Sequence, residues 1–158
     1  MKVFPVDSVV SELGSDGLPV YDRPYTSADL RNVYRAFLKD GVFLNVSTSL
    51  QVSPATGGMN VVVGAGSCLI QGAFGIEDAD RTLQLQAAHA TLDRIDTVVA
   101  RLDLAVAARS IDLYVVQGTP AANPLRPNLT RNETVWEIGL ADVYVPKAIT
   151  NVTAARIS

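Results

Sequence analysis

The chain has 158 residues, 48% of them hydrophobic and 18% charged, with a formal net charge of −3 at pH 7. A chain of this length is one domain that buries roughly 70% of its unfolded surface, enough for a hydrophobic core. Its basic residues are scattered singly. That pattern argues against nucleic-acid and membrane partners, which need a basic stripe or patch. The high apolar content predicts that some apolar surface faces a protein partner.

One cysteine, Cys68, and one histidine, His89, limit the available chemistry. A single cysteine forms no intrachain disulfide, and one histidine leaves too few ligands for an ordinary zinc site. Pro5 and Asp7 interrupt the apolar core that a signal peptide requires, and no long apolar run follows. We therefore expect a protein that is made and folded in a cytoplasm and that carries no metal or cofactor.

The N-terminal part predicts an extended arm followed by one helix. Residues 1–24 contain turn-forming residues at 14–19, and Arg23-Pro24 favours extended backbone. An arm of this kind needs a neighbouring surface on which to lie. The helix is expected at 26–39, capped by Thr26 or Ser27 and ended by a left-handed Gly41. The predicted division is thus an arm, 1–24, and a β-sandwich domain, 25–158, that begins with the helix.

Apolar side chains of the predicted helix recur at the 3.6-residue period on one stripe: Leu30, Val33, Tyr34, Phe37 and Leu38. Burial of each contributes on the order of 1.5–3 kcal/mol. We expect the stripe to cover one face of the chain's own sheet. The alternative is a contact between helices of different subunits, in an interface that would also include Tyr21 and Tyr25 of the arm.

From residue 42 onward the patterns predict short antiparallel strands, at 42–46, 50–52, 59–63 and 81–85. Leu83 and Leu85 share one face of the last of these, which predicts a half-exposed strand. Glycines between residues 64 and 75 indicate bends, bulges or close backbone approach. The expected fold class is mainly β, an antiparallel sandwich or flattened barrel with one N-terminal α-helix.

The longest predicted feature is a hairpin over 92–117 with a four-residue loop at 105–108. In this register Arg101 faces Asp112 and Leu102 faces Ile111. A shift of one residue would set Asp103 against Asp112, and like charges directly opposite each other are unfavourable. We expect both faces of this sheet to be covered.

Three prolines, Pro120, Pro124 and Pro127, exclude residues 118–131 from an inner strand. This segment is expected to cross the outside of the domain to a last long strand at 134–145, in which Trp136 belongs to the apolar alternation. Residues 149–157 are expected to add a closing edge strand.

Motifs that suggest chemistry have simpler structural explanations. Gly64-x-Gly66 lacks the third glycine and the following helix of a dinucleotide fingerprint. His89 lies in a polar loop with no nucleophile elbow nearby, and Cys68 has no adjacent positive charge, which predicts a buried thiol. The acidic turn Glu77–Asp80 could hold calcium, although its spacing matches no known calcium loop.

Charged residues around the hairpin predict structural ion pairs. The predicted buried strand begins with an acid, a base and a second acid: Asp93, Arg94 and Asp96. Two further charged residues, Arg101 and Asp112, lie within the hairpin. We expect these five residues to form ion pairs at the rim of the sheet. The alternative is a ligand-binding role for the first three.

An ordered series of short motifs runs from about residue 14 to residue 157: Ser15-Asp16-Gly17-Leu18-Pro19-Val20-Tyr21-Asp22-Arg23-Pro24-Tyr25, Gly41-Val42-Phe43, Gly58-Met59-Asn60-Val61-Val62-Val63, Ile70-Gln71-Gly72, Leu92-Asp93-Arg94-Ile95-Asp96, Val99-Ala100-Arg101-Leu102-Asp103, Gly118-Thr119-Pro120-Ala121 and Leu140-Ala141-Asp142-Val143-Tyr144-Val145-Pro146. As a series they resemble the N-terminal domain of structural proteins of tailed phages and prophages. These are baseplate or tail-fibre components similar to baseplate upper proteins and receptor-binding proteins of siphophages.

The resemblance implies a virion structural protein rather than an enzyme. Such a domain fixes a fibre or receptor-binding part to the tail tip, usually as a homotrimer or within a larger symmetric ring. The implied partners are further copies of the chain and other baseplate or tail proteins. The family pattern continues beyond Ile157, so any contact with host cell-surface polysaccharide is expected from a distal part after Ser158.

Two other functions stay open at this point. A carbohydrate-binding module contacting host cell-wall polysaccharide needs several exposed aromatic side chains, whereas Trp136 lies in an apolar alternation and Tyr21 and Tyr25 lie on the arm. A depolymerase or esterase needs a carboxylate pair or a nucleophile with its base, and His89 is poorly placed for that role.

Overall fold

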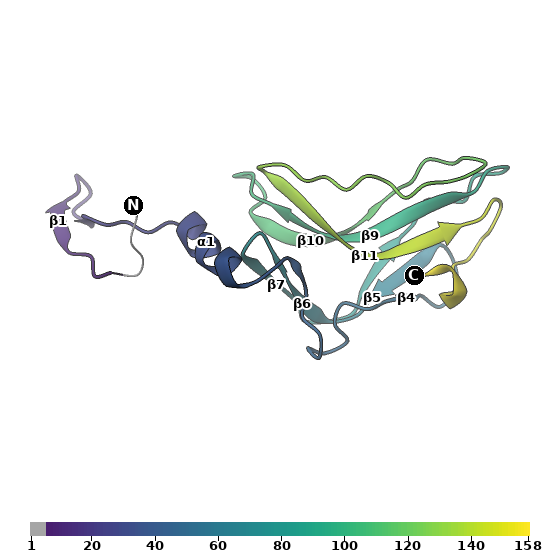
Figure 1. Cartoon of the computed structure of the whole chain (residues 1–158), viewed down its shortest axis with the longest axis horizontal. Coiled ribbons are helices and arrows are strands. Elements are labelled where there is room, and N and C mark those ends of the chain that lie inside the picture. Colours follow the sequence, from purple (N-terminus) through teal and green to yellow (C-terminus); the bar gives the residue numbers. More distant parts are fainter. Residues whose placement is uncertain (1–5) are drawn as a thin grey trace.

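A computed structural model describes residues 6–158 of the chain. The molecule is elongated, because an N-terminal arm and helix α1 (Ser27–Phe37) project from one end of a β-sandwich (Figure 1). The fold is mainly β, with one α-helix and several antiparallel sheets, which confirms the predicted fold class.

The first layer of the sandwich is the antiparallel sheet β10-β9-β11, with β9 in the middle. Its strands are β9 (Arg94–Asp103), β10 (Ser110–Val116) and β11 (Val135–Val145). Arg101 lies opposite Asp112 and Leu102 opposite Ile111, so the predicted hairpin register is confirmed. On the other side of β9, the register with β11 shifts between Gly139 and Ala141, which places a bulge at Leu140.

Two small antiparallel sheets, β3-β6-β7 and β4-β5-β8, form the second layer. Their strands are β3 (Gly41–Val42), β4 (Val52–Pro54), β5 (Asn60–Val63), β6 (Gly66–Ile70), β7 (Ala73–Glu77) and β8 (Arg81–Gln84). The strand predicted at 42–46 stops at Val42. The chain then forms a loop, because the backbone is left-handed at Asn45, Ser47, Ser49 and Leu50. A β-strand cannot continue through residues in that conformation.

Gly64 and Gly66 lie where this loop passes close to the sheet. A Cβ at Gly64 would lie 2.0 Å from Thr48 Oγ1, and one at Gly66 would lie 2.5 Å from the Leu50 nitrogen. The predicted close backbone approach is therefore confirmed. A hairpin turn at Gln71-Gly72 escaped sequence analysis, because Asn or Asp usually precedes the glycine of such turns. Asp40 holds Gln71 in the left-handed region by accepting its backbone N–H at 2.7 Å.

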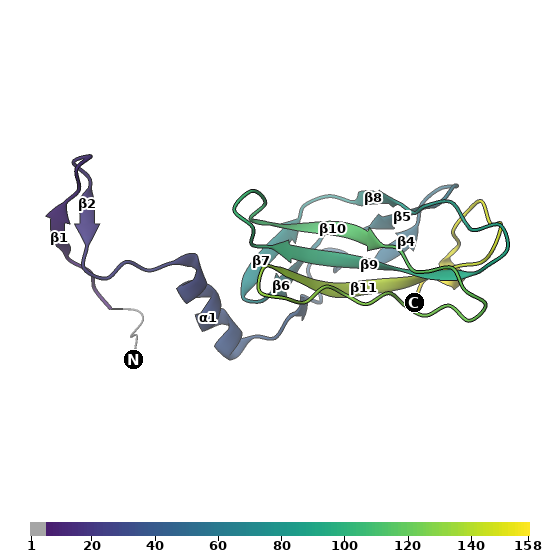
Figure 2. The ribbon, with the colours of Figure 1, turned by 90° about the horizontal axis from the view of Figure 1, so that it is seen from above.

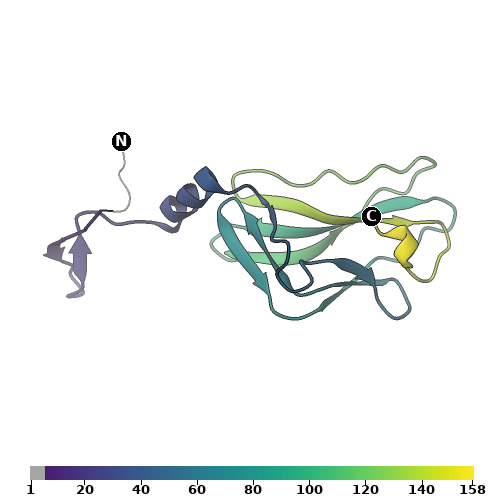
Figure 3. The ribbon, with the colours of Figure 1, turned by 60° about the horizontal axis from the view of Figure 1, so that its bottom comes forward.

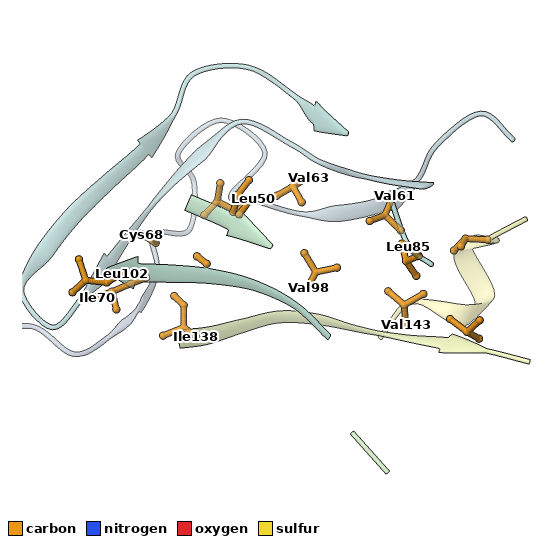
Figure 4. Packing of buried hydrophobic residues seen from close by; sticks show 14 residues of the cluster. Leu50, Val61, Val63, Cys68, Ile70, Leu85, Val98, Leu102, Ile138 and Val143 are labelled. Atoms are coloured by element: carbon orange, nitrogen blue, oxygen red, sulfur yellow. The ribbon is translucent and has the colours of Figure 1, made fainter. Parts of the chain in front are cut away.

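Aliphatic side chains from both layers pack between them as one core (Figure 4). Val98, Ala100 and Leu102 of β9 supply its centre, and Cys68 of β6 is also buried there. These residues alternate along β9 with residues on its opposite face, as the period of a strand requires.

A proline-rich segment, residues 118–134, is called the strap below. It runs along the outer face of the first sheet, as Figures 1 and 3 show, and pairs with the sheet only at isolated bridges such as Asp93–Ala121 and Arg131–Trp136. The predicted outside crossing is confirmed. The closing strand predicted at 149–157 does not form, because Val152 turns into the core and the chain then forms a 3-10 helix at Ala154–Arg156. Only Ile157, at its end, pairs with β11, through an isolated bridge to Val143.

Helix α1 begins at the predicted cap but does not pack where it was expected. Thr26 and Asp29 form a capping box, with the Asp29 N–H donating to Thr26 Oγ1 at 3.3 Å. The helix ends at Leu38, which has extended backbone, and Gly41 lies in β3 instead of supplying a left-handed stop.

No residue of α1 is buried, so the prediction that its apolar stripe covers the chain's own sheet is wrong. The second layer covers the inner face of the first sheet, and the strap covers the outer face of β9 and β11. The helix packs on neither of these faces and stands off the end of the sandwich (Figure 2). Its backbone meets the sandwich at Gly72, where a Cβ would lie 2.2 Å from the Arg31 oxygen.

The arm contains a small exposed hairpin, β1 (Val10–Leu13) paired with β2 (Pro19–Tyr21). Local hydrogen bonds hold it: Asp22 accepts the Val9 N–H at 3.0 Å, and the Tyr25 hydroxyl donates to the Val6 oxygen at 2.8 Å. The Val9 amide also lowers the pKa of Asp22. Helix and hairpin both lie outside the sandwich (Figure 2).

Candidate functional site

Arg94 and Asp96 form a buried ion pair at one end of the core. Arg94 Nε donates to both Asp96 carboxylate oxygens, at 3.0 and 3.1 Å, and both side chains are almost fully buried. The remaining guanidinium nitrogens donate to the Ala87 oxygen at 2.6 Å and to the Gln86 oxygen. Asp96 also accepts the Gly118 N–H at 2.9 Å. The pair therefore joins loop 86–87, strand β9 and the start of the strap.

Burial raises the pKa of Asp96, since removal from water penalises the carboxylate. The Gly118 amide and Arg94 oppose this effect by stabilising the charged form. Among the described residues, no buried side-chain nitrogen or oxygen lacks a hydrogen-bond partner. These contacts indicate a structural role for Arg94 and Asp96 and leave no donor or acceptor pointing at a ligand.

Asp93 does not belong to this ion pair. Successive residues of a strand point to opposite sides, so Asp93 points away from Arg94 and accepts the Tyr144 hydroxyl at 2.5 Å and the Lys147 N–H at 2.8 Å. The predicted network of three charges is therefore two separate arrangements. Asp93 fastens the end of β11 to the start of β9.

Arg101 and Asp112 face each other across β9 and β10 but bind other partners. Arg101 reaches Glu137 of β11, with Nη2 2.6 Å from Glu137 Oε1, and its guanidinium lies 4.4 Å from the Tyr114 ring centroid. Asp112, on the edge strand, pairs with Arg81 of β8. The charge argument thus predicted the right register but the wrong ion pair, because it considered only two strands and neither β11 nor β8.

Glu137 is the buried charge that sequence analysis missed. It is fully buried beneath the strap and accepts the Thr130 N–H at 2.5 Å in addition to Arg101. Farther along the same face, Thr97 donates to Asp142 at 2.6 Å and Arg126 of the strap lies 3.4 Å from the same carboxylate. Glu137 lies on the outer face of β11, opposite Arg101, and the strap covers it there.

Side chains considered for chemistry lie apart from one another. His89 is exposed, and its Nδ1 accepts the backbone N–H groups of Thr91 and Leu92, which makes it a loop cap. Cys68 is buried in the core, and burial raises its pKa to about 11. Residues 6–158 contain no group of three or more His, Cys, Asp or Glu side chains placed to hold a metal ion.

Three aromatic side chains on the surface of the sandwich are each held by a protein group. The guanidinium of Arg131 lies 5.7 Å from the Trp136 ring centroid, Arg101 covers Tyr114, and Tyr144 binds Asp93. A sugar platform needs open aromatic faces on which a saccharide ring can lie. Trp136 does line an open cleft of about 450 Å³ between α1 and the sandwich, together with the polar side of the helix.

The residues predicted for a subunit interface form a largely exposed apolar surface. On the helix, Phe37 is 81% exposed and Leu30 and Tyr34 are more than 40% exposed, while Val33 is half-buried. On the arm, Tyr21 and Tyr25 are exposed as well. In the part of the chain that the structure describes, no helix has the length and hydrophobicity to cross a bilayer.

A scan of family models gave no match to this chain, and neither did searches of curated proteins and of solved structures.

Proposed function

We propose that this chain is a virion structural protein, an assembly and attachment module of a phage tail-tip baseplate or tail fibre. It would anchor a distal receptor-binding part and work as part of a homo-oligomer, with a trimer the first expectation. The observation that carries the proposal is the apolar stripe of α1, which lies outside the core with Phe37 81% exposed. The resemblance of the ordered motif series supports it independently.

The physical argument starts from the cost of exposed apolar surface. Monomeric proteins rarely expose contiguous apolar patches, and such a patch usually marks an interaction site. Here the stripe projects on a helix that contributes nothing to the core, and the arm beside it adds Tyr21 and Tyr25. Helix and arm therefore act as the docking elements, and the sandwich acts as a rigid spacer held by its buried ion pairs. The proposal assigns no catalytic residue and no cofactor.

Immunogold labelling tests the proposed location. Antibodies raised against the purified chain should label the tail tips of phage particles released by the source bacterium. Antibody first absorbed with the purified chain should leave the tips unlabelled. Particles that carry no label, together with label confined to the cell fraction, would contradict the proposal.

Calorimetric titration with host wall polysaccharide tests the carbohydrate-binding alternative. Saturable binding by this chain that is lost in Trp136→Ala would assign the recognition of sugar to the cleft beside α1. The proposed assembly role predicts no saturable heat.

A further inference from the structure

We infer that the N-terminal arm of one copy of this chain docks in the cleft between α1 and the sandwich of a second copy, so that copies associate head to tail. The inference rests on the proposed assembly role and names its two surfaces. The arm surface is the tip of the β1–β2 hairpin, residues 12–18. The receiving surface, called the basal cleft below, is lined by α1 and by the end of the sandwich nearest to it.

The basal cleft has an apolar floor. Its two open halves, of about 450 and 470 Å³, share Arg31 of the helix and Leu102 and Leu104 at the end of β9. Trp136 adds to the lining of the first half and Phe74 to that of the second. The cleft can therefore receive apolar side chains.

The wall of the basal cleft is basic. The charged residues that line its two halves are three arginines, Arg31, Arg35 and Arg109, and one acid, Glu133. Within residues 6–158, none of the three arginines makes an ion pair. The lining thus carries a net charge of +2, from three bases and one acid, on a chain whose net charge is −3.

Charges next to the lining do not cancel this excess. Lys39 and Arg131 offset Asp40 and Asp103, and Asp40 accepts two hydrogen bonds from the β6–β7 turn. Asp29 lies two residues before Arg31, about 200° around the helix, and takes part in the capping box. An occupant of the cleft should therefore be acidic as well as apolar.

The arm has this combination of properties. Leu13 and Leu18, on either side of the hairpin turn, are 68% and 63% exposed, and Asp16 lies between them in the turn. Every residue of β1 and β2 is exposed, and an isolated two-stranded hairpin is at best marginally stable in water. A surface that covers the hairpin would stabilise it. The acids of residues 1–25 outnumber the bases by two: Asp7, Glu12, Asp16 and Asp22 against Lys2 and Arg23.

The arm does not occupy the cleft of its own chain. In Figures 1 and 2 the hairpin lies beyond the end of α1 that is farther from the sandwich. The acidic turn after β7 is a poorer occupant, because Glu77 already pairs with Arg81 and Asp80 accepts the Ala65 N–H. A contact between arm and cleft joins two different surfaces, so its repetition generates a ring when the rotation closes.

Sedimentation velocity on the full chain and two charge variants tests the contact. Arg35→Glu changes the cleft and Glu12→Lys the arm, and both side chains are exposed, so each variant should keep the circular dichroism of the parent chain. We expect each variant alone to associate at least about tenfold more weakly. Asp78→Lys, at an exposed position in the turn after β7, makes the same change in net charge as Glu12→Lys and should associate like the parent chain.

Mixing the two variants identifies the contact. The two substituted surfaces complement each other, as do the two intact ones, so an equimolar mixture should associate more tightly than either variant alone. An Arg35→Glu variant that dissociates while Glu12→Lys assembles like the parent chain would overturn the arm contact and leave the assembly role standing. A parent chain that stays monomeric at high concentration would also overturn it, whereas tail-tip labelling decides the proposed function separately.

Asp16→Asn provides an independent check on the hairpin tip. The substitution removes the charge but keeps an oxygen that can accept the Leu18 N–H, which Asp16 accepts at 3.1 Å. We expect weaker association that is also less sensitive to salt than that of the parent chain. Association that Asp16→Asn and added salt both leave unchanged would contradict the inference. Loss of association in Phe37→Ser, with Arg35→Glu and Glu12→Lys both unaffected, would assign the assembly to the helix stripe instead.

Discussion

Glu137 and Arg94 are charged side chains buried among aliphatic ones, and each binds a segment that has little or no strand pairing of its own. Glu137 accepts the Thr130 amide of the strap, and Arg94 donates to the carbonyl groups of loop 86–87. Burying a charge is costly unless it is paired and hydrogen-bonded. The Arg101–Glu137 and Arg94–Asp96 ion pairs therefore position the strap and loop 86–87, and they add little net stability.

Removal of the Glu137 carboxylate should destabilise the sandwich. Glu137→Ala leaves the Arg101 guanidinium and the Thr130 amide without their acceptor, and loss of one partner of a buried pair costs about 3–5 kcal/mol. Urea denaturation measures this loss. Glu133→Gln, at an exposed position on the strap, should change the free energy of unfolding by less than about 0.5 kcal/mol. Equal effects of the two substitutions would show that the Glu137 contacts are unimportant.

Asp93 and Tyr144 should stabilise the fold only in a defined pH window. Their hydrogen bond lowers the pKa of Asp93 below 3.8 and raises that of Tyr144 above 10.0. The contribution of Asp93 is present above its unfolded pKa and is lost as pH falls through its lowered pKa. That of Tyr144 is present below its unfolded pKa and is lost as pH rises through its raised pKa.

A double-mutant cycle of Asp93→Ala and Tyr144→Phe measures this coupling. The coupling free energy from urea denaturation should be greatest at neutral pH and should disappear in strong acid and in strong alkali. A coupling that persists unchanged in acid would mean that the hydrogen bond does not depend on the Asp93 carboxylate.

At the scale of elements, the strap buries part of the first sheet although it forms no helix or strand of its own. It covers the outer face of β9 and β11, so that Thr97 and Val99 are buried on a face that would otherwise meet water. It starts at Gly118, whose amide binds Asp96. The backbone approaches so closely there that a Cβ would lie 2.0 Å from the Ile95 oxygen.

A methyl group at Gly118 should therefore displace the strap. We expect Gly118→Ala to lower the free energy of unfolding by about 1–3 kcal/mol, the usual cost of overpacking. Gly139→Ala is a matched control under the same strap, because its Cβ would meet nothing closer than 3.5 Å. Urea denaturation of both variants checks the comparison, and a Gly118→Ala variant as stable as Gly139→Ala would contradict the close approach.

Element prediction succeeded where local residues decide the outcome. The capping box at Thr26, the alternation of β8 and the proline content of the strap all act within a few residues. Element prediction failed where contacts between segments far apart in the sequence decide the outcome. The Arg101–Glu137 pair joins residues 36 positions apart, and the loop at 45–50 takes its left-handed form beside Gly64 and Gly66.

For the whole molecule, the sandwich should be independent of the arm and helix. Residues 6–39 include no buried side chain, and the helix meets the sandwich closely at the Gly72 turn. We expect a chain of residues 40–158 to unfold at the same urea concentration as the full chain and to lose self-association. Sedimentation velocity and urea denaturation of both chains test this. A large loss of stability on truncation would show that the helix contributes to the core.

The sequence by itself determined the β class, the hairpin register, the helix start and the outside course of the strap. Each follows from the period, charge or proline content of one continuous segment. Only the tertiary structure decided which face of α1 is left open, which partner Arg101 takes and that Glu137 is buried. The physical reason is that burial depends on what covers a surface. The second layer covers the inner face of the first sheet and the strap covers β9 and β11, so the apolar helix stripe stays outside the core.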